Sequence, residues 1–285
     1  MKKKKQKGLK FTREQFNKIL QLYNVQPWLQ KKEDELFDLL GLCSNIAEQG
    51  LIFDLLIKFK YLTSSDISEY YEKIVEQVVE SWKLDPNETQ IVAISCDDNP
   101  DSGQAILWFL KYYLVKYSLS GFKLLNIFWK AIKHVEQRPN IVLVDEFAGT
   151  GTTVINRYKW LRNSIPAKYE YNIFVCIIAS MLNAKNNIED HGIELFTPLV
   201  LQKGIKHNYE GKKRKKAYRN MYKLELKLAE EVEDIRLPNL GWGFAEALYA
   251  QQYANAPNSV FPIFWWPKLN DGSIRNTILR RLMSD

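Results

Sequence analysis

Cysteine and histidine are scarce in this chain of 285 residues, with three of each. The cysteines are scattered and form no C-x-x-C pair, which argues against a disulfide framework and against a zinc site. The histidines are equally isolated, and no H-E-x-x-H pattern occurs. We therefore expect no metal ion that is held by the protein alone.

Long apolar runs are also missing. A transmembrane helix needs about 20 apolar residues, whereas the longest uninterrupted apolar stretch covers residues 173–179. The lysine-rich N-terminus leads into an amphipathic segment and lacks the apolar core of a signal peptide. We expect a cytoplasmic protein that does not enter a membrane.

Positive charge is concentrated in two patches. The net charge is +7, but residues 1–10 hold six Lys and no acid, and residues 201–220 hold eight Lys or Arg and one Glu. The other 255 residues therefore carry a net charge of −6, which indicates local anion binding rather than a uniformly cationic protein. A basic lid over an anionic site, a nucleic-acid surface or a merely solvated surface would each fit the second patch. Its candidate residues are Lys203, Lys206, Lys212, Lys213 and Arg214.

Apolar residues recur at helical spacing in the first third of the chain, where Thr63–Asp66 is a plausible helix start with Glu69 in capping-box position after Asp66. From about residue 87, β-branched runs alternate with helical segments. This pattern predicts an α/β fold whose parallel sheet is covered by helices on both faces. Strands are expected at 90–96, 140–144, 171–178 and 193–197, and helices at 104–117, 125–135, 154–163 and 209–232. We expect an N-terminal helical region (1–86), an α/β core (87–236) and a hood-like aromatic tail (237–285) that packs on the core.

Residues 141–153 combine an apolar strand, two acids, a Gly/Thr loop and a helix start. A glycine-containing loop can bring backbone N–H groups onto a phosphate, and the helix N-terminus adds partial positive charge. Asp145 and Glu146 accept hydrogen bonds, so they suit the vicinal hydroxyls of a sugar. Together these features describe a ribose-5-phosphate site. The residues expected to hold the phosphate are Phe147, Ala148, Gly149, Thr150, Gly151, Thr152 and Thr153.

This segment resembles the phosphoribosyl-diphosphate (PRPP) signature of type I phosphoribosyltransferases. Asp145 and Glu146 match its acidic pair, and residues 150–153 match its Thr-Gly-x-Thr. The resemblance implies a phosphoribosyltransferase-like fold in which the acids bind the ribose hydroxyls and the loop binds the 5-phosphate, with Mg²⁺ on the donor phosphates. A Walker B strand would need a G-x-x-x-x-G-K-[ST] upstream, and none occurs. A strand–turn–helix without any ligand stays open.

The resemblance also implies a pyrophosphate loop after the first strand of the core. The candidates are Asp97, Asp98, Ser102 and Gly103. The two acids suit pyrophosphate poorly unless Mg²⁺ lies between them. A loop that has lost this role, or a solvated acidic turn, remains an alternative.

The tail, with Gly241–Phe244, Asn255–Trp266 and the pair Arg280-Arg281, resembles a phosphoribosyltransferase-like family of bacterial conflict loci, including retron and other anti-phage cassettes. Trp28–Gln30 and Tyr61–Asp66 fit that family too. The resemblance implies an antiviral toxin effector that acts on PRPP or a nucleotide. Two alternatives stay open: an inactive nucleotide-sensing module, and a nucleic-acid-binding subunit that associates with retron RNA–DNA or a reverse transcriptase. For the tail aromatics we favour packing in a core over stacking on bases.

Overall fold

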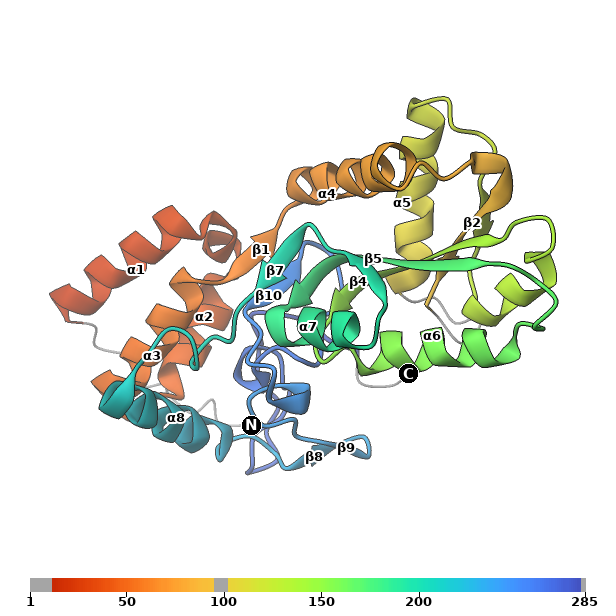
Figure 1. The fold of residues 1–285 in the computed structure, drawn as a ribbon. Coiled ribbons are helices and arrows are strands. Elements are labelled where there is room, and N and C mark those ends of the chain that lie inside the picture. The colour runs from red at the N-terminus through yellow and green to blue at the C-terminus, as the bar shows by residue number, and fades with distance from the viewer. Residues whose placement is uncertain (1–11, 95–101, 283–285) are drawn as a thin grey trace. The chain divides into compact units, whose positions relative to one another are not determined.

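A computed structural model describes residues 12–94 and 102–282 of the chain (Figure 1). They form two compact units, which we call the helical unit and the sheet unit. The helical unit combines the chain up to Tyr61 with Lys203–Ala250 and the chain from Asn258 onward, and the sheet unit combines Leu62–Gln202 with Gln251–Pro257. The ranges expected from the sequence (1–86, 87–236 and 237–285) run consecutively, whereas both units are discontinuous.

The sheet unit is built on a six-stranded sheet of order β3-β2-β4-β5-β6, with β7 also paired to β5. Every one of these pairings is parallel. Its elements are α4 (Ser64–Glu76), the π-helix η2 (Gln77–Ser81), the 3₁₀ helix η3 (Pro86–Glu88), β2 (Thr89–Ala93), α5 (Ser102–Lys116), β3 (Lys123–Leu125), the 3₁₀ helix η4 (Phe128–His134), β4 (Asn140–Ala148), α6 (Thr152–Ser164), β5 (Asn172–Met181), α7 (Leu182–Asp190), β6 (Glu194–Phe196) and β7 (Leu199–Leu201).

The central strands are apolar because helices cover both faces of the sheet. All five residues of β2 and residues 141–144 of β4 are buried, as a parallel sheet between two helical layers requires. α4 and α5 pack together on one face and α6 and α7 on the other (Figure 1). The predicted parallel sheet with helices on both faces is therefore confirmed.

Several details differ from the sequence prediction. The short strands β3 and β7 were not predicted, because three residues are too few to show a periodicity. The expected helix at 125–135 is the 3₁₀ helix η4. The capping box of α4 is formed by Thr63 and Asp66, not by Asp66 and Glu69. Thr63 Oγ1 accepts the Asp66 N–H at 3.3 Å, and the Asp66 carboxylate accepts the Thr63 N–H at 2.8 Å.

The helical unit has its own apolar core. α3 packs against α8, and the aromatic tail contributes Phe261, Phe264, Trp265 and Trp266, which are at most 2% exposed. These four aromatics are thus core residues, as expected, whereas Trp242 and Phe244 of the same tail are 60% and 63% exposed. The elements are α1 (Arg13–Val25), the 3₁₀ helix η1 (Pro27–Lys32), α2 (Glu33–Gly41), α3 (Ile46–Ile57), β1 (Lys60–Leu62), α8 (Gly211–Glu225), β8 (Glu231–Val232), β9 (Ile235–Arg236), the 3₁₀ helices η5 (Trp242–Phe244) and η6 (Pro262–Phe264), and β10 (Tyr249–Gln251), with β1 and β10 at the passages to the sheet unit.

The helix predicted for 209–232 ends seven residues early, at Glu225. Tertiary pairing explains the early end. Leu228 forms an antiparallel bridge with Leu269, and the Ala229 N–H donates to the Lys268 carbonyl. These partners lie about 40 positions further along the chain, so no local pattern could reveal them. No helix in the described part of the chain has both the length and the apolar character needed to cross a membrane.

Candidate functional site

The candidate site lies where the connections of the sheet change direction. From β2 the chain crosses through α5 to β3 on one side, whereas from β4 it crosses through α6 to β5 on the other. Right-handed crossovers in opposite directions place α5 and α6 on opposite faces. The carboxyl ends of β2 and β4 therefore flank a topological switch point, the usual ligand crevice of open α/β sheets.

The two acids lie inside β4 rather than beyond it. The ladder with β5 continues through Asp145, opposite Ile177, as far as Ala148, opposite Ser180. Successive strand residues point to opposite faces. Asp145 and Glu146 therefore project on opposite sides of the sheet, which the sequence motif alone did not indicate.

Each carboxylate has a distinct environment. Asp145 is half-buried, and its Oδ1 accepts the Glu146 N–H at 2.8 Å. Glu146 is half-buried and acts on Tyr71 of α4. Burial of the Tyr71 hydroxyl raises its pKa most, and the negative charge of Glu146 raises this pKa further. Glu146 therefore lies on the side of the sheet that α4 covers. The Tyr71 side chain is 3% exposed on α4. The two acids are thus chemically inequivalent although they are adjacent in sequence.

The turn after β4 requires a glycine at its last position. Gly151 is the N-cap of α6 and has φ = 79°, in the left-handed region. A Cβ there would lie 2.8 Å from Ile188 Cγ1 and 3.0 Å from the Ala184 carbonyl oxygen of α7. The turn therefore approaches α7 as closely as a residue without a side chain allows.

Polar groups face the start of α6. The Thr150 hydroxyl lies 3.0 Å from Thr152 Oγ1, and the Asn187 side-chain amide donates to the Thr150 carbonyl at 3.0 Å. No acidic residue occurs in the first turn of α6, and Thr152 and Thr153 are exposed. Exposed hydroxyls beside the N–H groups of a helix N-terminus form a site suited to an anion.

The other half of the expected site is described only in part. Asp97 and Asp98 lie outside the described residues. Ser102 and Gly103 are the first residues of α5, which follows β2. β2 runs beside β4, and the Ile94 N–H donates to the Val144 carbonyl at 3.1 Å. Because β2 and β4 end at the same edge, Ile94, directly after β2, lies beside the start of the acidic pair.

The expected basic residues belong to the helical unit and differ in their contacts. Lys203 Nζ donates to the Phe244 carbonyl at 2.6 Å, and Arg214 Nε donates to the Tyr209 carbonyl at 2.6 Å. These two side chains therefore support local structure. Lys206, Lys212 and Lys213 are exposed. A role as a lid stays a prediction.

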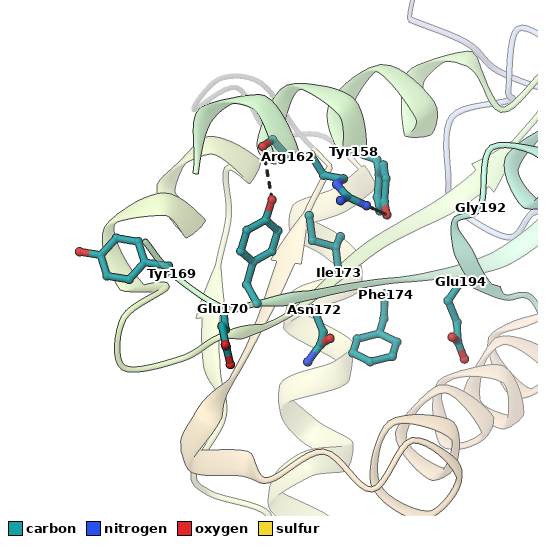
Figure 2. A pocket seen from close by; sticks show the side chains of 10 residues that line it. Tyr158, Arg162, Tyr169, Glu170, Asn172, Ile173, Phe174, Gly192 and Glu194 are labelled. Carbon is teal, nitrogen blue, oxygen red and sulfur yellow. Dashed lines mark hydrogen bonds between the residues drawn. The ribbon is translucent and has the colours of Figure 1, made fainter. Parts of the chain in front are cut away.

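A pocket of about 480 Å³ opens at the other end of the strands (Figure 2). Tyr158 and Arg162 of α6 line it, together with the segment that enters β5 and with Glu194 of β6. Arg162 donates to the Tyr158 hydroxyl at 3.2 Å, and the Tyr171 hydroxyl donates to the Arg162 carbonyl at 3.3 Å. Sequence reasoning missed this pocket because its residues come from three separate segments and form no motif.

Comparison with known families agrees with the motif and the sheet. The sequence profile of the PRTase-CE family matches residues 27–281. The chain belongs to this family. The match spans both units of this PRTase-CE chain, so the helical unit is part of the family's common sequence and not an addition to it.

Similarity to individual proteins is low. A comparison with curated proteins gives no match. Among solved structures, the orotate phosphoribosyltransferase from Aeropyrum pernix is similar with 16% sequence identity and a TM-score of 0.31, over 48% of this chain and 71% of that chain.

Proposed function

We propose that this PRTase-CE chain binds a ribose-5-phosphate donor, such as PRPP or a nucleotide, at the turn from β4 to α6. The observation that carries the proposal is the position of this turn. It joins a carboxylate-bearing strand to an exposed helix N-terminus at the switch point of the sheet. The 5-phosphate would contact the Thr150–Thr153 segment, and a carboxylate of β4 would accept the ribose hydroxyls.

We propose that the enzyme transfers the phosphoribosyl group. Loss of the leaving group at the anomeric carbon passes through a transition state with oxocarbenium character, as in other glycosyl transfers. The chain holds and orients the sugar by its 5-phosphate and hydroxyls. Within the described residues, no three His, Cys, Asp or Glu side chains are grouped to hold a metal ion. As the resemblance implies, we expect Mg²⁺ to arrive on the donor phosphates, whose charge it neutralises, with Asp145 and Glu146 as candidate oxygen ligands.

We further propose that the biological role is that of an effector in bacterial anti-phage defence of the retron type. The support is the resemblance of residues 241–244, 255–266 and 280–281 to proteins of such loci. One feature favours a second candidate, a nucleotide sensor without turnover. Asp145 and Glu146 project on opposite faces, so a single sugar is not expected to engage both carboxylates equally.

Calorimetric titration with PRPP and Mg²⁺ tests the donor site. We expect wild type to bind, and Asp145→Asn/Glu146→Gln to bind at least about 10-fold more weakly, since a hydrogen bond to a charged group contributes about 1.5–3 kcal/mol. Glu136→Gln/Glu170→Gln is the matched control. It removes the same charge from exposed carboxylates that do not belong to the turn.

The outcomes separate the candidates. If the double variant and the control bind like wild type, the proposed site is wrong. PRPP binding without release of pyrophosphate, in the presence of candidate acceptors, would favour the sensor over the transferase.

A further inference from the structure

The exposed face of α8 carries a continuous row of cations. Lys212, Lys216, Arg219 and Lys223 follow each other at i, i+4, i+7 and i+11, so they lie along one side of the helix. With a rise of 1.5 Å per residue, the row is about 16 Å long. Lys213 and Lys215 flank it, and all six side chains are exposed.

These six cations have no acidic partner in the described part of the chain. Within the described residues, none of them forms an ion pair with a carboxylate. The nearest acids do not pair with them either. Asp54 accepts the Tyr209 hydroxyl at 2.9 Å, and Glu210 precedes the helix without capping it by its side chain.

This arrangement opposes helix stability. Lys212 and Lys213 lie in the first turn, at the positive end of the helix dipole, and no acid occurs there. The pairs Lys212–Lys216 and Arg219–Lys223 place like charges at i, i+4, where they destabilise a helix. Cations at a helix N-terminus and like charges at i, i+4 both cost stability, and a cost that the sequence keeps without an evident gain in stability indicates a functional surface.

The rest of the helix shows which kind of anion fits. The apolar face, with Ala217, Met221 and Leu224, is buried, and α8 packs against α3. It cannot be inserted into a bilayer, as an interfacial membrane helix requires. What remains accessible is a linear row of cations at a repeat of about 5–6 Å. Tyr222, 58% exposed, lies beside the row and offers a stacking surface.

We propose that the outer face of α8 binds the phosphate backbone of a single-stranded nucleic acid without reading its sequence. Successive phosphates contact the Lys212–Lys223 row and neutralise its positive charges, which have no acidic partner in the described part of the chain. The bound strand also lies near the N-terminus of α8, whose partial positive charge favours an anion. This inference does not depend on PRPP binding, because α8 belongs to the helical unit.

Binding of a labelled 20-nucleotide single-stranded DNA to the full chain, measured against salt, tests the proposal. The variant is Lys212→Gln/Lys216→Gln/Arg219→Gln. Six neutralised phosphates predict a slope of log K against log salt of about −4, and three fewer cations reduce its magnitude by about 2. If the lines meet near 1 M salt, the variant binds about 100-fold more weakly at 0.1 M.

The matched control is Lys31→Gln/Lys133→Gln/Lys268→Gln, which removes three exposed cations elsewhere. Residues 1–10 are identical in all three proteins, so their lysines cancel in the comparison. Because like-charge repulsion is relieved, the α8 variant should melt at the same temperature as wild type or higher. If the cations instead stabilised the fold, the α8 variant would melt at a lower temperature than wild type.

The control and the α8 variant losing affinity equally would overturn the proposal. So would an affinity for single-stranded DNA that does not change with salt. Phosphatidylserine vesicles and polyglutamate are the comparison ligands: tighter binding to either one than to DNA at equal salt would assign the face to a membrane or an acidic protein instead.

Discussion

Asp145 and Glu146 show how two adjacent identical charges acquire different tasks. Both belong to β4, and the pleat of the strand sends them to opposite faces. The charge of Glu146 acts on Tyr71 of α4. Asp145 therefore projects from the face on which α6 packs, and α6 is the helix that follows the phosphate turn.

We predict unequal effects of the two single substitutions. Asp145→Asn should weaken PRPP binding about 10- to 100-fold, because a charge-assisted hydrogen bond contributes about 1.5–3 kcal/mol. Glu146→Gln should change it less than about threefold. Titration calorimetry of both variants measures the difference. Equal losses would mean that the sugar reaches both faces of β4.

At the scale of the element, the turn between β4 and α6 combines two constraints on one glycine. Gly151 needs a positive φ, and it also needs space, because a Cβ there would lie 2.8 Å from Ile188 Cγ1 and 3.0 Å from the Ala184 carbonyl oxygen. Gly192 has φ = 70° but nothing within 4 Å of its Cβ position. Comparing substitutions at Gly151 and Gly192 therefore separates the cost of a left-handed backbone from the cost of a steric clash with neighbouring atoms.

Gly192→Ala should lower the free energy of unfolding by about 1 kcal/mol, the cost of the left-handed conformation alone. Gly151→Ala should lower it by about 2–4 kcal/mol, since overpacking against α7 adds about 1–3 kcal/mol. Urea unfolding monitored by circular dichroism gives both values. If the two variants were equally destabilised, the contact with α7 would have relaxed and would not define the turn.

At the scale of the whole molecule, the buried acid Glu225 should contribute to the dependence of stability on pH. Glu225 of α8 is 2% exposed, and burial raises its pKa to about 8, although the Leu240 N–H donates to its carboxylate at 3.0 Å. A raised pKa means that the folded chain holds a proton that the unfolded chain has released. Between about pH 4.5 and pH 8 the contribution of Glu225 to the free energy of unfolding therefore falls as pH rises, by at most about 1.4 kcal/mol per pH unit.

Glu225→Gln keeps the hydrogen-bond acceptor and removes the titration. Its stability relative to wild type should increase from pH 5 to pH 8 and then level off. Urea unfolding at pH 5, 6.5 and 8 measures this, with exposed Glu210→Gln as the control. Parallel pH profiles for Glu225→Gln and wild type would show that Glu225 is ionised throughout.

The sequence by itself determined the features that depend on neighbouring residues. The run from Ile141 to Val144 predicted a buried strand, because apolar residues with β-branched side chains suit a strand covered on both faces. The Gly/Thr turn before α6 could also be predicted from neighbouring residues, because glycine favours a left-handed backbone and threonine supplies a hydroxyl. The alternation of strands with helices then predicted a parallel sheet.

Tertiary structure alone decided what depends on distant partners. The tail pairing that ends α8 at Glu225, the pairing of β7 with β5 and the pocket lined by Arg162 each join residues far apart in the sequence. The faces of Asp145 and Glu146 also became known only when the ladder with β5 showed β4 continuing to Ala148. A sequence motif records which residue types are adjacent, whereas the direction of a side chain depends on the strand or helix that the rest of the chain stabilises.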